Sequence, residues 1–515
     1  MPLATVHSYA LLGVNAQPIQ IEVHLANGLP GLTIVGLPEA SVRESKERVR
    51  SAISNSGFEY PAQRITVNLA PADIPKFGSG YDLAIAVGIL RASEQLTGSE
   101  LDDFSFLGEL SLSGQLRPVP GILPVAVQAQ DDHLQLITAE STGEDFSLVD
   151  SSNMLCAGNL CQVAEHLLGG TPLSRPKNSD HFSVTPNHNE LCLSDVQGQS
   201  QAKRALTIAA AGGHSLLMQG PPGTGKTMLA SRIPGIMPQL GVRDAVEVAS
   251  IYSISSLPNP NPRLPPFRSP HHTCSQVALV GGGSKPAPGE ISLAHRGVLF
   301  LDELPEFPAR VLEVLRQPME SGKVSVSRAA FKAIFPARFQ LVAAMNPCSC
   351  GYLGEARCRC TPDRIAQYQG RISGPLLDRI DMHIRLQRVR QEIKLDQDAK
   401  SDSSAKIRQQ VTQCKKVQLE RQGYCNSELT GSQIQEILIR NPALAELAQR
   451  AIDRMDLSMR AIHRVVRISQ TIADLDQSSL KKEHMLEALN FRQDMGNSGI
   501  TASGRSTIGP AFTDS

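Results

Sequence analysis

The residues best suited to chemistry lie first in one glycine-rich stretch, where Gly220, Gly225, Lys226 and Thr227 occupy every fixed position of a phosphate-binding loop. Backbone N–H groups of such a loop wrap a phosphate chain, the lysine reaches the β- and γ-phosphates, and the threonine hydroxyl holds Mg²⁺. A buried-strand pattern before the loop and a helical start after it favour this interpretation over a glycine-rich surface turn with a stray lysine. We therefore expect a nucleotide to bind at Gly220, Pro221, Pro222, Gly223, Thr224, Gly225, Lys226 and Thr227.

Two adjacent carboxylates, Asp302 and Glu303, follow a run of apolar residues typical of a strand buried on both faces. Parallel strands present such groups at their carboxyl ends, where open α/β sheets bind ligands. Asp302 would then complete the Mg²⁺ shell, and Glu303 would polarise the attacking water. A third apolar run, 339–345, ends at Asn346, an amide that could orient the water or contact the γ-phosphate. The alternative for Asn346 is a cap of the turn before the next proline.

Four cysteines follow that amide in two C-x-C pairs, Cys348, Cys350, Cys358 and Cys360. Four thiolates suit tetrahedral Zn²⁺, and four free reduced thiols are the alternative. A zinc ion held by four thiolates has no open position, so it would make the loop rigid rather than catalyse a reaction. The adjacent pair His271 and His272 is interpreted as structural, because neighbouring residues rarely ligate one ion without further partners.

The composition excludes a global electrostatic signal. Among 515 residues, 50 lysines and arginines balance 50 aspartates and glutamates, so any site for a polyanion must be local. No apolar run approaches the roughly 20 residues that span a bilayer, and the N-terminus lacks the pattern of a signal peptide. Ten cysteines in a chain with a nucleotide site fit a reducing compartment, so we expect a cytoplasmic protein.

The elements that must position these residues divide the chain into five parts. Residues 1–168 alternate strand-like and helical patterns, which predicts an α+β domain. Residues 169–191 are rich in proline, serine and asparagine and predict a linker. Residues 192–390 carry the nucleotide motifs on an α/β module, and 391–495 predict an all-helical lid. Residues 496–515, rich in glycine, serine and threonine, predict a disordered tail.

Two insertions of the nucleotide module could provide the local polyanion site. Residues 257–292 contain glycines and prolines that argue against regular helix, which predicts a projecting loop with Lys285 at its tip. Residues 323–335 pair two strand-like runs about a basic turn, which predicts a hairpin carrying Lys323, Arg328 and Lys332. In a ring these cations would line a central channel and contact DNA. The alternative is a solvated basic loop.

Taken together, these features resemble the ComM/YifB family of magnesium-chelatase-like AAA+ ATPases over about residues 1–493. The segments that carry the resemblance are Phe267-Arg-Ser-Pro-His-His272, Gly289-Glu-Ile-Ser-Leu-Ala-His295, Phe300-Leu-Asp-Glu-Leu-Pro-Glu306 and Gly374-Pro-Leu-Leu-Asp-Arg379. The resemblance implies a multidomain α/β protein with ATP, Mg²⁺ and a homo-hexameric ring. It further implies a helicase that drives branch migration of DNA during natural transformation, with single-stranded, branched or recombinase-coated DNA as its partner.

The resemblance also implies roles for individual residues. Asn346 takes the sensor-1 position of AAA+ proteins, and residues 193–199 look like the segment that packs on the adenine. Arg379 takes the position of an arginine finger, which a neighbouring subunit supplies to stabilise charge on the γ-phosphate. An exposed Arg379 paired with a nearby aspartate is the alternative. On the helical lid, Arg460 is the first choice for the sensor-2 contact to the γ-phosphate, and Arg464 is the second.

The first domain resembles the Lon-protease-like, ribosomal-S5-type fold. By register, the catalytic serine and lysine of a Lon-type protease fall on Gly80 and Pro124, which have no reactive group. We therefore expect a non-proteolytic domain that contacts DNA or builds the ring, and we interpret Asp82 and Glu109 as structural carboxylates. The segments that carry this resemblance are 68–72, 76–86 and 108–114.

Two other functions stay open at this point. One is ATP-dependent remodelling or metal insertion, as in the magnesium-chelatase subunit that the ATPase module resembles. The other is Lon-like ATP-dependent proteolysis, which Gly80 and Pro124 disfavour.

Overall fold

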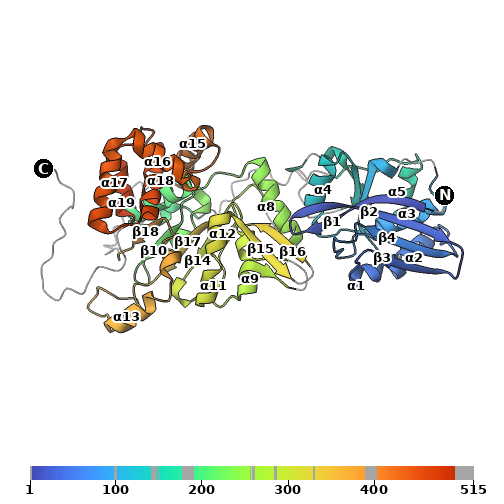
Figure 1. Cartoon of the computed structure of the whole chain (residues 1–515), viewed down its shortest axis with the longest axis horizontal. Coiled ribbons are helices and arrows are strands. Elements are labelled where there is room, and N and C mark those ends of the chain that lie inside the picture. Colours follow the sequence, from blue (N-terminus) through green and yellow to red (C-terminus); the bar gives the residue numbers. More distant parts are fainter. Residues whose placement is uncertain are drawn as a thin grey trace.

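The computed structural model describes residues 3–97, 101–140, 148–149, 151–176, 191–255, 257, 261–283, 287–328, 331–388 and 403–492. The molecule is elongated (Figure 1). The N-terminal domain (residues 3–168) lies at one end, and the central domain (192–388) and the helical domain (403–492) lie together at the other.

A seven-stranded mixed sheet forms the centre of the N-terminal domain, in the order β3-β4-β2-β1-β5-β8-β9. β1 and β2 form a long hairpin whose two-residue turn contains Gly13, at φ +66°. A positive φ at such a turn suits glycine. The strands are β1 Leu3–Leu12, β2 Asn15–Ala26, β3 Gly31–Val35, β4 Arg64–Ala70, β5 Phe104–Leu107, β8 Gln135–Ala139 and β9 Met154–Ala157.

Helices cover this sheet, and α3 lies against β1, β2 and β5. Almost every residue of α3 is buried, as its apolar sequence predicts. The longer helices are α2 Ser45–Asn55, α3 Asp82–Ala92, α4 Ile122–Asp131 and α5 Leu160–Leu167, with a single turn, α1 Ala40–Arg43, before α2. The sequence predicts an α+β domain, and the strands and helices confirm it.

Two elements differ from the sequence prediction. The apolar pattern of residues 106–112 predicts one strand, but β5 ends at Leu107, and Glu109–Leu110 (β6) pairs instead with Leu116–Arg117 (β7). The expected linker also begins with structure, because Ser174 forms an isolated bridge with Cys156. Both differences depend on pairing with another segment of the chain, which the residue pattern within one segment does not reveal.

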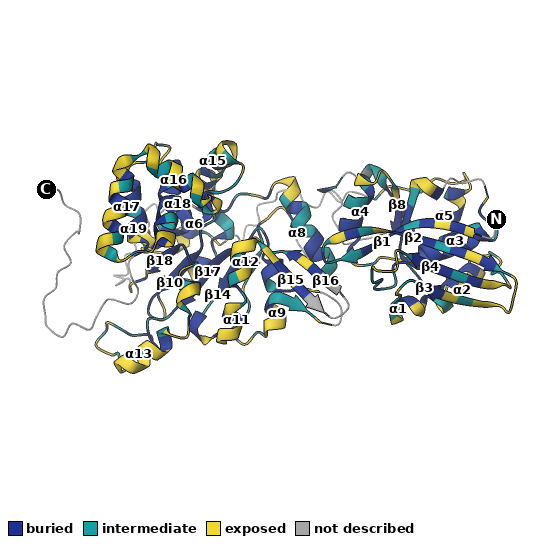
Figure 2. Cartoon of the chain, viewed as in Figure 1, coloured by how far each residue is buried: buried dark blue, intermediate teal, exposed yellow. Residues whose placement is uncertain are grey.

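A five-stranded, fully parallel sheet forms the centre of the central domain, in the order β11-β14-β17-β10-β18. Every residue of β10, β14 and β17 is buried, in agreement with their continuous apolar sequences. Figure 2 shows this buried centre. The strands are β10 Leu216–Gln219, β11 Phe267–Arg268, β14 Val298–Leu301, β17 Gln340–Met345 and β18 Met382–Arg385.

The helices of the central domain are short apart from α6 and α8. They are α6 Ser200–Gly212, α7 Lys226–Ala230, α8 Val242–Ser255, α9 Gln276–Val280, α10 Glu290–Leu293, α11 Ala309–Glu313, α12 Arg316–Ser321, α13 Pro362–Gln369 and α14 Gly374–Leu377. The prediction that 257–292 contains no regular helix is wrong, since α9 lies within it. The Ser275 side chain caps α9 by accepting a hydrogen bond from the Ala278 amide at 3.1 Å.

The predicted basic hairpin is present as β15 (Lys323–Arg328) and β16 (Phe331–Pro336). Val324, Val326, Ala333 and Phe335 are buried in the core beside the central sheet. The hairpin is therefore anchored by one apolar face.

The C-terminal domain is helical, as predicted. It consists of α15 Ser404–Gln422, α16 Gly431–Arg440, α17 Pro442–Met455, α18 Met459–Leu475 and α19 Lys482–Asn490. Within the described part of the chain, every helix is too short or too polar to cross a bilayer.

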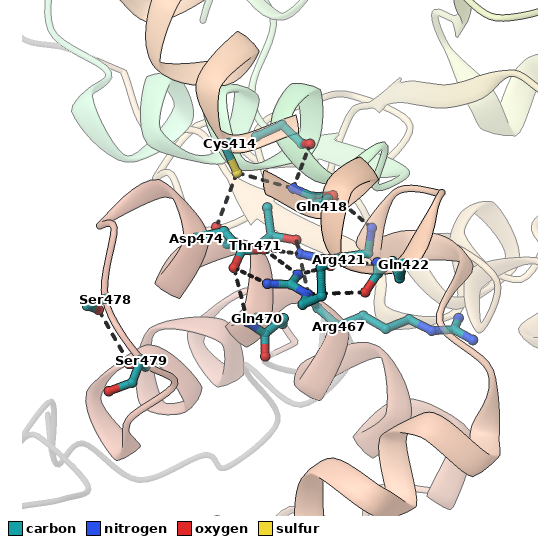
Figure 3. Close-up of polar contacts among 12 residues, drawn as sticks. Cys414, Gln418, Arg421, Gln422, Arg467, Gln470, Thr471, Asp474, Ser478 and Ser479 are labelled. Atoms are coloured by element: carbon teal, nitrogen blue, oxygen red, sulfur yellow. Dashed lines mark hydrogen bonds and ion pairs between the residues drawn. The ribbon is translucent and has the colours of Figure 1, made fainter. Parts of the chain in front are cut away.

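Polar contacts tie the helices of the helical domain to one another (Figure 3), and two of them reach the central domain. The Asp474 carboxylate accepts two hydrogen bonds from Arg421, at 2.7 and 2.8 Å. Gln418 donates to the Ala211 carbonyl at 3.1 Å, and Thr471 shares a 2.7 Å hydrogen bond with the fully buried ring of His214. Since α6 carries Ala211 and His214 follows it, this network ties α15 and α18 to the central sheet.

A separate set of contacts joins the N-terminal domain to the central domain. The Gly121 amide donates to the Ser253 carbonyl of α8 at 3.2 Å. The β1–β2 turn lies against β16, where a Cβ added to Gly13 would stand 2.8 Å from the Ile334 oxygen. The turn and the hairpin are thus in direct contact.

Candidate nucleotide-binding site

The predicted phosphate loop lies between β10 and α7, in the strand–loop–helix context that the motif requires. Gly223 and Gly225 take φ values of +79° and +84°, which glycine adopts without the strain of a side chain. The Lys226 ammonium donates to the carbonyls of Gly220 and Pro221 at 2.7 and 3.0 Å. Burial lowers the pKa of Lys226, while the negative charges of the two nearby carboxylates oppose that shift.

Thr227 and Asp302 meet beneath the loop, although 75 residues separate them in sequence. The Thr227 hydroxyl donates to Asp302 Oδ2 at 2.6 Å. Adjacent ligand oxygens of an octahedral Mg²⁺ ion lie about 2.9 Å apart, so this hydroxyl and carboxylate fit neighbouring coordination positions. The pair is brought together as the sequence predicts.

Glu303 begins the segment after β14 in a left-handed conformation, at φ +52°. Its amide donates to Asp302 Oδ1 at 2.9 Å, and its carboxylate Oε2 lies 3.4 Å from Nδ1 of His272. The ring of His272 in turn lies 4.1 Å from the ring of His271. Sequence reasoning assigned His272 only a structural role, and its contact with Glu303 was missed because it joins two segments 31 residues apart.

Asn346 follows β17 and touches the loop lysine. Its Oδ1 accepts a hydrogen bond from Lys226 Nζ at 3.1 Å. The polar side chains at the carboxyl ends of β10, β14 and β17 therefore converge at one edge of the parallel sheet.

The four cysteines form one cluster in which all Sγ atoms lie within 4.8 Å of one another: Cys348, Cys350, Cys358 and Cys360. Burial and the neighbouring thiols raise the pKa of Cys348 to about 12. Backbone amides of Arg359 and Tyr352 lower the pKa of Cys350 to about 6. Such a cluster can hold a metal ion, as predicted.

Arg379 lies at the amino ends of the parallel strands, whereas the phosphate loop lies at their carboxyl ends. Arg379 is three residues before Met382, which begins β18 and pairs in parallel with the first residue of β10, Leu216. Its guanidinium pairs with Glu320 at 2.5 Å and donates to the Pro375 carbonyl at 2.7 Å. The expected alternative partners were nearby aspartates, so the observed pairing with Glu320 was not anticipated.

The two arginines of the helical domain considered for the sensor-2 contact, Arg460 and Arg464, lie on α18. Arg464 pairs with Asp381 at 3.2 Å, and burial lowers the pKa of Arg464 together with the positive charges of Arg379 and Arg460. Arg460 is exposed at the start of α18. Arg464 is therefore held at the amino end of β18, close in sequence to Arg379, and Arg460 lies one helical turn away from it on α18.

Three of the predicted DNA-contacting residues belong to the hairpin. Lys323 begins β15, and the backbones of Arg328 and Lys332 lie near the hairpin tip in the pairs Arg328–Phe331 and Ser327–Lys332. Lys285 lies outside the described residues.

The N-terminal domain contains two of the carboxylates considered above. Asp82 is fully buried and accepts hydrogen bonds from Arg48 at 2.7 and 3.1 Å, which supports its structural role. Glu109 hydrogen-bonds with Ser79. Gly80 packs beside Leu107, and Pro124 is buried in α4, so the positions of the serine and lysine of a protease hold no reactive group.

Three family models cover most of the chain. "Magnesium chelatase, subunit ChlI" matches residues 192–394, "Subunit ChlI of Mg-chelatase" matches 21–141, and "Magnesium chelatase, subunit ChlI C-terminal" matches 401–492. Together with the parallel sheet and the phosphate loop, these matches define a magnesium-chelatase-like protein of the AAA+ class.

Relatives that match nearly the whole chain identify the family within this class. The chain is 48% identical to "Competence protein ComM" of Haemophilus influenzae, over 96% of this chain and 98% of that protein. It is 47% identical to "Uncharacterized protein YifB" of Escherichia coli (strain K12), over 96% and 97% of the two chains. The "Magnesium-chelatase 38 kDa subunit" of Cereibacter sphaeroides is 27% identical over 30% of this chain and 52% of that subunit. The chain belongs to the ComM/YifB family of magnesium-chelatase-like proteins.

Proposed function

We propose that the protein is an ATP-driven DNA translocase that assembles as a homo-hexameric ring and promotes branch migration in the cytoplasm. In this role it acts during natural transformation, when incoming single-stranded DNA is integrated by homologous recombination. The observation that carries the proposal is the separation of Arg379 from its own phosphate loop by the length of the parallel strands.

Within one subunit, the residues around the loop supply most of a hydrolytic site. Thr227 and Asp302 would hold Mg²⁺, which neutralises charge on the β- and γ-phosphates. Lys226 would leave the Gly220 and Pro221 carbonyls to contact the phosphates, and Glu303 would orient and polarise the attacking water. Asn346, already in contact with Lys226, would contact the γ-phosphate.

The missing cation of this site is proposed to come from the neighbouring copy. A phosphoryl-transfer site needs a positive charge near the γ-phosphate in the transition state, and an arginine finger contributes about 10³–10⁵ in rate. Arg379 is the candidate, and its ion pair with the exposed Glu320 would exchange for the phosphate contact. Since Arg464 pairs with Asp381, two residues after Arg379, and Arg460 lies one helical turn before Arg464 on α18, we assign any γ-phosphate contact of Arg460 to the neighbour's nucleotide as well.

DNA is the proposed polyanion of the channel. The hairpin β15–β16 is anchored by its apolar face and carries Lys323, Arg328 and Lys332. Lysine and arginine contacts to phosphates bind nucleic acid without regard to sequence, as a translocase requires. The name of the Haemophilus relative, a competence protein, supports single-stranded DNA taken up by the cell as the substrate.

For the four-cysteine cluster we propose zinc as the bound metal. A tetrahedral zinc–tetrathiolate site with Zn–S bonds of about 2.3 Å has S···S edges of about 3.8 Å. The Sγ atoms of Cys348, Cys350 and Cys358 are 3.4, 3.7 and 3.9 Å apart in pairs, close to this edge length. A disulfide would require about 2.05 Å.

The test of the proposed function is branch migration of a three-strand DNA junction with and without ATP. We expect product only with ATP and the unmodified protein, and none with Glu303→Gln. ATPase activity should rise when single-stranded or branched DNA is added. An ATPase rate that does not change when DNA is added, together with no branch migration, would contradict the DNA translocase function. The remaining function would be nucleotide-dependent remodelling.

A further inference from the structure

The loop that carries the four cysteines is in contact with the phosphate loop. We call residues 346–361, between β17 and the start of α13, the cysteine loop. Within it Gly351 takes φ +83°, and a Cβ added there would lie 2.6 Å from Cδ and 3.2 Å from Cγ of Pro222. Pro222 is the third residue of the phosphate loop, so the two loops leave no room for a side chain between them.

A second contact ties the same two loops together through Arg388. Its Nη2 donates to the Pro222 carbonyl at 3.2 Å, and its Nε lies 3.5 Å from Glu355 of the cysteine loop. The same guanidinium lies over the ring of Tyr352, 5.4 Å from its centre. The cysteine loop therefore reaches Pro222 both directly at Gly351 and through Arg388.

The cysteine cluster is what organises this loop. Residues 346–361 contain turns and bends but no helix or strand. Its backbone is held by turns next to the cysteines, in which the Gly351 amide donates to the Cys348 carbonyl at 2.9 Å and the Cys358 amide donates to the Glu355 carbonyl at 3.0 Å. A metal ion would cross-link Cys348 through Cys360 and hold Gly351, which lies beside Cys350, in a fixed position.

We propose that metal occupancy of the cysteine cluster sets the shape of the phosphate loop, so that loss of zinc weakens ATP binding without any contact between zinc and ATP. The path runs from the cluster to Gly351 and from Gly351 to Pro222. This inference rests on the proposed zinc and ATP sites. The new element is that the affinity for ATP depends on zinc occupancy of the cysteine cluster.

Two glycines of the cysteine loop provide a matched test. Gly351 and Gly354 have nearly the same φ, +83° and +89°, so alanine strains the backbone equally at both. A Cβ at Gly354 meets nothing within 4 Å, whereas at Gly351 it meets Pro222. Zinc content is measured by mass spectrometry of the metal, and affinity by titration with a fluorescent ATP analogue in Mg²⁺.

We expect both variants to keep one zinc per chain. The Kd for the nucleotide should rise about fivefold or more in Gly351→Ala, equivalent to about 1 kcal/mol, and stay within about twofold of the parent in Gly354→Ala. Equal Kd values for the two variants would overturn the coupling while leaving the zinc and ATP sites intact.

Removal of the metal gives the complementary measurement. The double variant Cys350→Ser/Cys358→Ser should lose zinc and bind the nucleotide as weakly as Gly351→Ala, while circular dichroism reports whether the rest of the chain is folded. Unmodified protein purified under reducing conditions that neither contains nor takes up zinc would refute the zinc site itself. Unmodified protein that holds zinc and binds no ATP would refute the proposed nucleotide function instead.

Discussion

His272 Nδ1 lies 3.4 Å from Oε2 of Glu303, so the residue proposed to polarise water already has a partner. Both side chains are partly exposed, at 31% and 54%, and a pair of this kind contributes at most about 1 kcal/mol. If the pair holds Glu303 away from water, His272→Ala should raise basal ATPase activity up to about fivefold. Phosphate release without DNA measures the rate. His271→Ala is the control, because the described contacts of His271 are with Thr273 and the His272 ring; a lower rate in His272→Ala would show that the contact positions Glu303 productively.

Lys226→Ala and Glu303→Gln should separate binding from hydrolysis. The first removes the ammonium that faces the phosphates, so we expect loss of ATP binding in an equilibrium titration. The second keeps the shape of the site but removes the group that polarises water, which lowers kcat by about 10² or more. It should therefore bind ATP and accumulate as an assembled ring in analytical ultracentrifugation. Normal turnover by Glu303→Gln would remove this residue from its proposed role.

Mixing two inactive variants tests whether Arg379 acts on a neighbour. Arg379→Ala should lower ATPase activity by about 10³ or more. Lys226→Ala is expected to lose ATP binding but keeps Arg379, so mixed rings should contain some sites in which an intact Lys226 faces an intact Arg379. Activity should reappear on mixing. As a control, Arg316→Ala removes another surface arginine, which pairs with Glu313 at 2.6 Å, and should retain activity; the absence of recovery in the mixture would place Arg379 outside the neighbour's site.

The hairpin predicts a salt-dependent DNA affinity. Lys323→Ala/Arg328→Ala/Lys332→Ala should weaken binding of single-stranded DNA and reduce the slope of log K against log salt by about 0.7 for each lost phosphate contact. Fluorescence anisotropy at several salt concentrations gives both quantities. Lys415→Ala/Lys416→Ala, on α15, is a control that removes two positive charges where the hairpin variant removes three. If both variants weakened DNA binding equally, DNA binding would depend on the total positive charge of the protein and not on the hairpin.

Two buried histidines predict a loss of stability in acid. Burial lowers the pKa of His214 to about 4 and that of His383 to about 3. Between about pH 6.5 and 4 the unfolded chain binds protons that the folded chain does not, so the free energy of unfolding falls as pH falls. Each histidine contributes a slope of about 1.4 kcal/mol per pH unit there. Denaturant unfolding across this window should show a shallower slope for His214→Gln; an unchanged slope would mean that His214 is protonated when folded.

The sequence predicts the phosphate loop, the buried strands and the pairing of Thr227 with Asp302, because fixed spacing and continuous apolar runs encode them locally. The contacts of His272 with Glu303 and of Gly351 with Pro222 could not be read in this way. Each joins segments that only the order of the parallel strands brings together, and neither involves an unusual residue type. The helix α9 was missed for a related reason, since glycines and prolines flank it while Ser275 supplies its cap.

The contact of Gly13 with Ile334 and the Gly121–Ser253 hydrogen bond have a mechanical meaning for the proposed ring. The hairpin strand β16 cannot tilt toward the N-terminal domain without pushing the β1–β2 turn, and β1 is one of the middle strands of a seven-stranded sheet. A displacement of the hairpin would therefore be transmitted to the whole N-terminal domain. In the proposed ring, the six N-terminal domains would therefore move together with the hairpins during successive rounds of ATP hydrolysis, rather than independently of them.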